Sequence, residues 1–98
     1  MIKLSRIIKV IREYPNLTPT EAKLILFLYD RGGFASHSEI ALFLERPIKG
    51  DGDWAKALTL TKVFVHRIRK EIGKPLLVSV WGQGYDLTPN ARLLSAVE

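Results

Sequence analysis

The sequence predicts an α+β domain that is mainly α: three helices and a β-hairpin, with one further helix at each end of the chain. Apolar residues recur at helical spacing in residues 2–13, 18–31, 36–44 and 57–73. Residues 76–87 are rich in β-branched and aromatic residues around a turn with two glycines, which is typical of a hairpin. With 98 residues, the chain has the length of one domain with a small core.

The composition excludes several classes of protein. The chain has no cysteine, which rules out disulfide frameworks and thiolate metal sites and is compatible with an intracellular setting. The hydrophobic fraction of 47% is that of a globular protein rather than a disordered one. No apolar run is long enough to span a bilayer, and charged residues interrupt the N-terminus where a signal peptide needs an apolar core.

Positive charge is concentrated in two segments of a chain whose net charge is +5. Residues 1–13 hold four basic residues and one acidic residue, and residues 62–74 hold five and one, so the two segments carry +3 and +4. Each segment could be an ordinary solvated helix face. Because self-repulsion makes such clustering costly unless a polyanion relieves it, we favour a nucleic-acid partner.

The helix predicted at 1–14 is amphipathic and ends before Pro15, whose ring disfavours helix at the preceding residue. Its apolar stripe should consist of Leu4, Ile7, Ile8 and Ile11, widened by Val10 and Tyr14. Such a helix could cap the domain's own core, form a dimer contact or lie on an anionic membrane. We favour packing against protein, within the chain or between copies, over the membrane, because no other segment is typical of a membrane anchor.

The next helix has clear signals at both ends. Thr18 and Glu21 form a T-x-x-E capping box, and Pro19 suits the first turn. The residues expected in the core are Ala22, Leu24, Ile25, Phe27 and Leu28. The helix should end at residues 31–33, Arg-Gly-Gly.

A second capping box opens the following helix. Residues 34–35 should be a short extended piece, after which Ser36 and Glu39 repeat the capping pattern. The apolar residues of this helix are Ile40, Leu42, Phe43 and Leu44.

Residues 46–56 are predicted to be the main loop, because one proline and two glycines break regular structure there. Asp51 and Asp53 fall far short of an EF-hand ligand set, and a solvated turn is the better interpretation. Trp54 could plug the edge of the core or contact a partner, and we favour the core.

The helix predicted at 57–73 has a buried back and a cationic front. Its core stripe is spaced 3, 4, 3 and 4 residues apart and consists of Leu58, Thr61, Val65, Ile68 and Ile72. The opposite face carries Thr59, Val63, His66, Arg67 and Lys70, with Lys74 just beyond the end and Lys62 and Arg69 at one edge of the stripe. Gly73 provides the stop, because glycine enters the left-handed region at low cost.

The hairpin at 76–87 turns at Gly82 and Gly84. The two glycines could also suggest a phosphate loop, but a G-x-G without a following helix is weak evidence for one. A short helix at 88–98 completes the chain, with Ala91, Leu93, Leu94 and Val97 as its apolar residues.

Two short helices that lead to a cationic third form helix-turn-helix geometry, and the hairpin behind them is a wing. In this order, LTPTEAKLILFL at 17–28, FASHSEIALFL at 34–44, VFVHRIRKEIG at 63–73 and LLVSVWGQGYDL at 76–87 resemble the winged-helix DNA-binding domain of OmpR/PhoB-type response regulators. The expected fold is then one winged helix-turn-helix domain over 1–98. A three-helix core plus a C-terminal β-hairpin wing occupies 17–87, with the added helices at 1–14 and 88–98.

The resemblance implies a sequence-specific, double-stranded DNA-binding transcriptional regulator in a bacterial or phage-type cytoplasm, associated with the nucleoid. Its recognition helix at 57–73 would enter the major groove, and its wing at 76–87 would reach the backbone or the minor groove. In the family, the loop that corresponds to 46–56 can contact RNA polymerase, which becomes a further expected partner. A homodimer through residues 2–13 or 90–98 is expected as well, because one such domain offers few contacts.

The sequence also departs from the family pattern. Only sixteen residues precede Leu17, and residues 2–13 are predicted to be helical. We therefore expect neither the family's receiver domain, with its phosphorylation switch, nor its N-terminal sheet. Trp81 and Asp86 stand where basic residues are usual in the wing, and Glu45 stands where tryptophan is usual. The wing is thus less cationic than in the family, which leaves more of the recognition to the helix.

The predicted DNA contacts divide into base readers and phosphate partners. The base-edge candidates are Thr59, Lys62, Val63 and His66, of which Val63 suits a thymine methyl. Arg67 can read guanine or clamp a phosphate with its bidentate fork. The expected phosphate partners are Arg69, Lys70 and Lys74, together with the helix starts at Thr18, Thr20, Ser36 and His37. Gln83 at the wing tip can reach a sugar or a base edge.

One alternative function stays open. Winged helices are also used to hold partners, so the chain could be a protein–protein adaptor that acts on RNA polymerase or another regulator. An enzyme is not expected, because the sequence has no nucleophile–base pair and no glycine-rich phosphate loop with its lysine. His66 has no second histidine or cysteine at metal spacing, so we expect neither a metal nor a cofactor.

Overall fold

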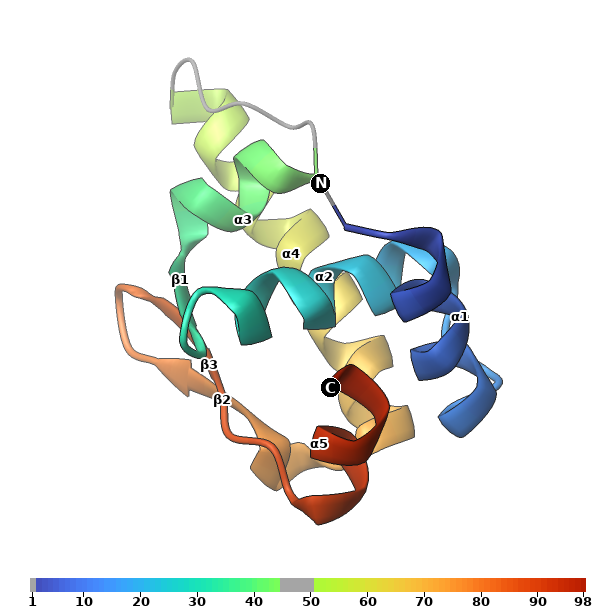
Figure 1. The fold of residues 1–98 in the computed structure, drawn as a ribbon. Helices are drawn as coiled ribbons and strands as arrows, with labels where there is room; N and C mark the ends of the chain where they lie inside the picture. Colours follow the sequence, from blue (N-terminus) through green and yellow to red (C-terminus); the bar gives the residue numbers. More distant parts are fainter. Residues whose placement is uncertain (1, 45–50) are drawn as a thin grey trace.

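The computed structural model describes residues 2–44 and 51–98, and the side chains of all of them except 51–53. Figure 1 shows the described elements, which are five α-helices, a 3-10 turn and a three-stranded antiparallel sheet. The described chain is therefore α+β and mainly helical, as predicted. Its arrangement is compatible with a winged-helix-like fold.

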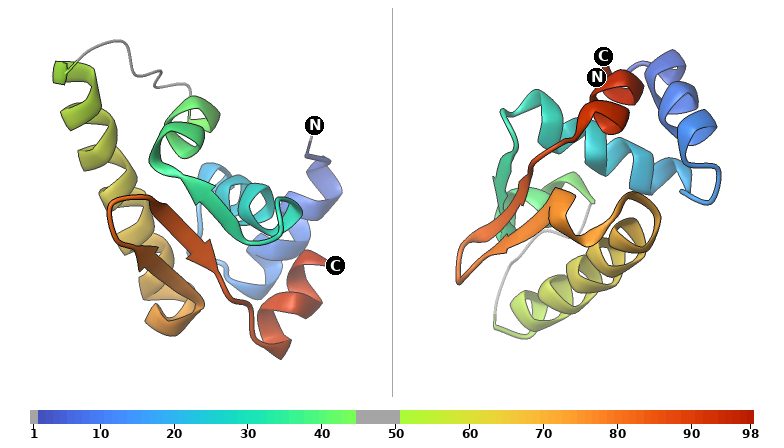
Figure 2. Two further views of the ribbon diagram at one scale, coloured as in Figure 1. Left: turned by 90° about the vertical axis from the view of Figure 1, so that its left-hand side faces the viewer. Right: turned by 90° about the horizontal axis from the view of Figure 1, so that it is seen from below.

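The two ends of the chain pack against each other. Helices α1 (Leu4–Glu13) and α5 (Ala91–Val97) lie side by side, and α1 also packs on α2 (Figures 1 and 2). Ile7 and Val10 of α1 are buried, as expected. Leu4 and Ile8 of the predicted stripe are 69% and 41% exposed, because the neighbours of α1 cover the side of the helix that carries Ile7 and Val10.

Both predicted capping boxes are confirmed, at α2 (Pro19–Asp30) and α3 (His37–Phe43). The Thr18 hydroxyl accepts from the Glu21 N–H at 3.2 Å, and the Glu21 carboxylate accepts from the Thr18 N–H at 2.8 Å. The same pair of bonds joins Ser36 and Glu39 at 3.1 and 2.9 Å. These reciprocal bonds satisfy backbone N–H groups that a helix start leaves without partners, which explains why both helices begin where they do.

Helix α2 supplies much of the buried core. Its buried apolar residues are Ala22, Leu24, Ile25, Leu26 and Leu28. Phe27 is only half-buried, and its ring stacks on that of Phe43 in α3 with centroids 4.4 Å apart. In α3, Ile40 is buried, whereas Leu42 is 68% exposed.

The predicted hairpin is confirmed as β2 (Leu77–Val80) and β3 (Gly84–Leu87), and it gains a third strand. The short piece predicted as extended is β1 (Phe34–Ser36), which pairs with β3 in the sheet order β1-β3-β2. A side chain at Gly84 would collide with the backbone oxygen of Ala35. This close approach of β1 explains the second glycine of the G-x-G, whereas Gly82 serves the turn with a φ of +70°.

Helix α4 (Asp51–Ile72) starts six residues earlier than predicted. The predicted loop at 46–56 is therefore wrong over 51–56, and its residues 46–50 lie outside the described residues. Residues 51–53, which were expected in a solvated turn, belong to α4 instead.

The inner face of α4 carries the predicted core stripe. Thr61, Val65, Ile68 and Ile72 are buried, and buried Ala57 takes the place expected for Leu58, which is half-buried. Gly73 ends the helix with a φ of +106°, as predicted, and the 3-10 turn η1 (Lys74–Leu76) leads into the hairpin. Figure 2 shows α4 running along one side of the molecule, with the hairpin crossing beside it.

Candidate nucleic-acid interface

The outer face of α4 brings together most of the predicted base and phosphate contacts. The side chains of Thr59, Lys62, Val63, His66, Arg67 and Lys70 are all exposed on this helix. With 22 residues, α4 is about 33 Å long, enough to lie along a duplex groove. We call these six residues, together with Lys74 in η1, the α4 face.

Lysine supplies the uncompensated positive charge of the α4 face. Lys62, Lys70 and Lys74 are exposed and form no ion pair with an acidic side chain in the part of the chain that the structure describes. An exposed row of cations on one helix is the electrostatic footprint that phosphate contacts require.

Arg67 already has an acidic partner within the chain. Its Nε lies 3.1 Å from Oε2 of Glu21, whose side chain is only 2% exposed. The pair lacks hydrogen-bond geometry, since Glu21 Oε2 has no hydrogen-bond partner among the described residues. The other carboxylate oxygen of Glu21 caps α2. Arg67 thus neutralises a buried capping carboxylate, while its own side chain stays 57% exposed.

Arg69 connects α4 to the hairpin. Its Nε donates to the backbone oxygen of Leu77 at 2.6 Å, and its Nη2 donates to the hydroxyl of Ser79 at 3.2 Å. The guanidinium also lies over the ring of Tyr85, 5.9 Å from its centroid. The predicted phosphate partner is therefore held in three contacts that position the sheet against the helix.

His37 lies where α3, β3 and α4 meet. Its ring meets those of Tyr85 and Trp54 edge-on, at centroid distances of 5.4 and 6.1 Å. Burial lowers the pKa of His37, and the positive charge of Lys62 lowers it further. A neutral imidazole is a weaker phosphate partner than the prediction assumed. Trp54 itself is 39% exposed at the start of α4, so its predicted place in the core is wrong.

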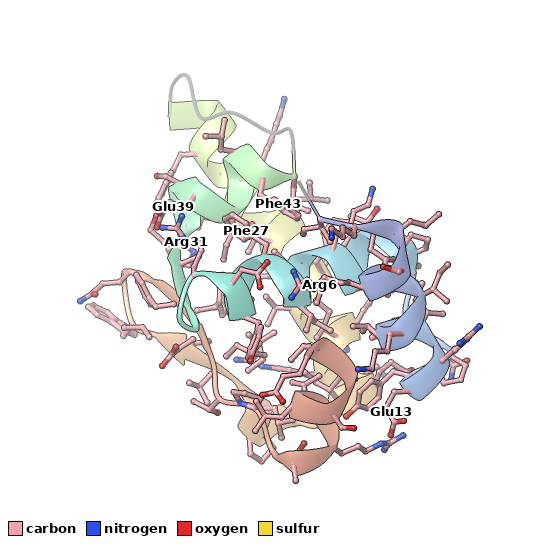
Figure 3. The ribbon with its side chains drawn as sticks, viewed as in Figure 1. Arg6, Glu13, Phe27, Arg31, Glu39 and Phe43 are labelled. Carbon is pink, nitrogen blue, oxygen red and sulfur yellow. The ribbon has the colours of Figure 1, made fainter. Side chains whose placement is uncertain are left out.

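The two helix starts predicted to hold phosphates are already occupied by side chains. The hydroxyls of Thr18 and Ser36 accept the N–H groups that an anion would use, and each box adds a glutamate. Glu39 is paired with Arg31, as Figure 3 shows, and Glu21 with Arg67. Thr20 remains exposed, but it lies beside a hollow shared with α3 rather than on the α4 face.

A shallow hollow of about 430 Å³ lies on the first half of the α4 face. It is lined by Ala55, Lys56, Thr59, Leu60 and Val63. Val63 is 50% exposed, and the Thr59 hydroxyl donates to the backbone oxygen of Ala55 at 3.0 Å. This part of the face therefore offers mainly methyl groups, with Lys56 as its cation. Sequence reasoning missed Lys56 because the helix was expected to begin at residue 57, and it assigned Leu60 to neither face of that helix.

The tip of the hairpin is aromatic and polar instead of cationic. Trp81 is 94% exposed, and Gln83 beside it is exposed as well. Residues 77–87 contain neither lysine nor arginine. Trp81 was noted in the sequence only as a departure from the family pattern, although an aromatic residue in a two-glycine turn is itself a sign of an exposed contact residue.

The residues that the structure describes contain no group of three or more histidine, cysteine or acidic side chains that could hold a metal ion. None of the helices they form has the length and apolar character needed to cross a membrane.

Comparisons with known proteins add no further information. No family model matches the chain, and neither the curated proteins nor the solved structures include a significant match.

Proposed function

We propose that the chain is a sequence-specific double-stranded DNA-binding transcriptional regulator of the winged-helix type, similar to the OmpR/PhoB domains. In this proposal α4 enters the major groove, and the hairpin of β2 and β3 lies at the backbone or the minor groove. Two copies would bind neighbouring half-sites as a homodimer, because the contacts of one α4 face are few.

The observation that supports the proposal best is the state of the cations on α4. Lys62, Lys70 and Lys74 are exposed without a described acidic partner, whereas four arginines, Arg6, Arg31, Arg67 and Arg92, form ion pairs within the chain. Three uncompensated charges on one side of a small domain repel each other, and a row of phosphates relieves that repulsion.

The proposal divides the α4 face into two halves. The methyl-rich first half, with Val63 and Thr59, would read base edges, and thymine methyls suit it best. The second half, with Lys70 and Lys74, would contact phosphates and set the register. His66 lies between the two halves. The exposed part of Arg67 can contact a base edge or a phosphate while the side chain stays beside Glu21.

A binding experiment at two salt concentrations tests the proposal. Gel shifts of genomic fragments, followed by selection of a preferred duplex, should give a sequence-selective complex that weakens as salt rises. Replacement of Lys70 by alanine should weaken binding to all sequences alike and lower the salt slope by about one unit. The absence of any selective shift at low salt would contradict the proposal.

One observation favours a second candidate function, an adaptor that holds RNA polymerase or another regulator. The hairpin has no basic side chain, and its most exposed residue is Trp81, at 94%. Exposed tryptophan is typical of protein–protein contacts, whereas a DNA-binding wing would ordinarily carry cations. Two measurements distinguish the candidates. If the chain is an adaptor, Trp81→Ala should abolish binding to purified RNA polymerase, and the wild type should give no salt-sensitive shift of DNA.

A further inference from the structure

A groove on a different part of the molecule has no assigned role. One hollow, of about 510 Å³, is lined by Ile2, Leu4, Ile7, Lys23 and Phe43. A second, of about 360 Å³, is lined by Thr20, Lys23, Phe43 and Leu44. The two share Lys23 and Phe43, so they adjoin each other where α1, α2 and α3 meet, and we call them together the groove. The groove has no residue in common with the α4 face.

The first hollow is mainly apolar, the second is mixed, and the wall that they share at Phe43 is fixed. Phe43 stacks on Phe27 at 4.4 Å, so its ring is held in place, as Figure 3 shows. Ile7 is buried, whereas Leu4 is 69% exposed at the mouth. An apolar side chain left this open beside a preformed hollow marks a surface that another molecule covers.

The charge around the groove is positive. Lys23 lines both hollows, and none of the described residues that line them is acidic. Lys3, between Ile2 and Leu4 in the chain, is exposed as well. Neither lysine forms an ion pair with a described acidic side chain.

This charge decides between the possible occupants. A second copy of the chain in a two-fold interface would place the same patch on itself, with lysines opposite lysines. A bilayer needs an apolar face that projects, but most apolar residues here line a concave surface. We propose that the groove binds an acidic amphipathic helix of another protein. Apolar side chains of that helix fill the two hollows, and its carboxylates meet Lys23 and Lys3.

The chain offers a matched pair of variants for the test. Leu4 and Leu42 are 69% and 68% exposed, but only Leu4 lines the groove. Leu4→Glu and Leu42→Glu change the net charge equally, and neither removes a buried side chain, so both should fold. The probe is a phage-displayed library of random peptides of about 16 residues, between four and five helical turns, panned on the wild-type chain.

The enriched peptides should be acidic, with apolar residues spaced 3 and 4 apart. Synthetic copies should bind wild type and Leu42→Glu alike in fluorescence anisotropy, and Leu4→Glu at least about tenfold more weakly, because a leucine contact is lost and a carboxylate opposes the peptide. Lys23→Glu should weaken them too. Enrichment of basic peptides, equal binding to both leucine variants, or no enrichment would overturn the proposal.

Two further measurements decide whether another occupant takes the groove. Sedimentation equilibrium of the free protein that shows a dimer sensitive to Leu4→Glu would put a second copy there. Cosedimentation with phosphatidylserine vesicles that depends on Leu4 would put a membrane there. The proposal predicts neither effect. DNA binding by the α4 face is independent of all these outcomes.

Discussion

The two basic clusters of the chain are nearly equal in the sequence but differ in the fold. Residues 1–13 and 62–74 carry +3 and +4. In the first cluster, Arg6 forms a two-pronged bond to Asp30, at 2.8 and 2.9 Å, and the Lys9 ammonium donates to the backbone oxygen of Glu98 at 2.6 Å. These contacts tie α1 to α2 and to the end of the chain, whereas Lys3 and Arg12 stay exposed without a described acidic partner.

The second cluster is divided. Arg67 and Arg69 are engaged by Glu21 and by the hairpin, whereas Lys62, Lys70 and Lys74 remain exposed without a described acidic partner. The arginines hold the fold together through several directed hydrogen-bond donors, and the lysines stay available as point charges. The comparison teaches that a basic cluster is a candidate binding surface only where packing leaves its charges unpaired.

The largest effect should come from the arginine that faces a buried carboxylate. Arg67→Ala should lower the free energy of unfolding by about 1–3 kcal/mol, because Glu21 is then buried without its counter-charge. Urea unfolding measures this loss. Lys70→Ala, on the same face of the same helix, should change stability by less than about 0.5 kcal/mol.

A second substitution isolates the cause. Glu21→Gln in the Arg67→Ala background keeps an oxygen to cap α2 but removes the buried charge, so stability should recover in part. Equal losses in Arg67→Ala and Lys70→Ala would show that the two residues do not differ as we describe.

The next effect concerns the connection between α4 and the hairpin. Arg69→Ala should cost about 1–2 kcal/mol of stability, because the buried backbone oxygen of Leu77 loses its donor. Hydrogen exchange should become faster in β2 and β3 and stay unchanged in α1. Lys74→Ala is the control. If exchange in the hairpin were unaffected by Arg69→Ala, Arg69 would not be the link.

The apolar half of the α4 face predicts a smaller effect on DNA binding. Deoxyuridine in place of each thymine of a selected duplex removes one methyl group, and at the contacted position this should cost about 0.8 kcal/mol, roughly a fourfold loss of affinity. Val63→Ala should bind the thymine and deoxyuridine duplexes alike. An equal loss in wild type and Val63→Ala would assign the methyl contact to another residue.

The smallest effect is the pH dependence that His37 contributes. Burial and Lys62 hold the pKa of His37 in the folded protein below its ordinary value of 6.5. As pH falls through 6.5, the unfolded chain takes up the proton first, so the stability that His37 contributes is complete above this pH and decreases below it. Urea unfolding at several pH values between about 7.5 and 5 should show this decrease in wild type and a weaker one in His37→Gln. Identical profiles would contradict the assignment.

Local signals in the sequence predicted much of this fold. The capping boxes at Thr18 and Ser36, the stop at Gly73 and the hairpin each depend on residues that are neighbours in the chain. The early start of α4 was missed because the proline and the two glycines of residues 46–56 were weighed as breakers of regular structure.

The remaining differences arise from contacts between distant segments. Helical periodicity marks apolar positions but not which of them a neighbour covers, so it did not show that Leu4, Ile8 and Leu42 would be exposed. The pairing of Arg67 with Glu21 joins two helices, and no pattern within either helix reveals it. The α4 face was therefore predicted as a surface, but the sequence did not show that Arg67 would be paired while the lysines stay without a described acidic partner.

The salt dependence of DNA binding tests the central claim most directly. On one selected duplex, the slope of log K against log salt is measured for wild type, for Lys70→Ala with Lys74→Ala, and for Lys9→Ala with Arg12→Ala. The first pair should lower the slope by about 1.8 units, at about 0.9 for each lost phosphate contact, and the second pair should leave it unchanged. An equal or larger change for the α1 pair, or a slope that neither pair alters, would contradict the assignment of the binding surface to α4.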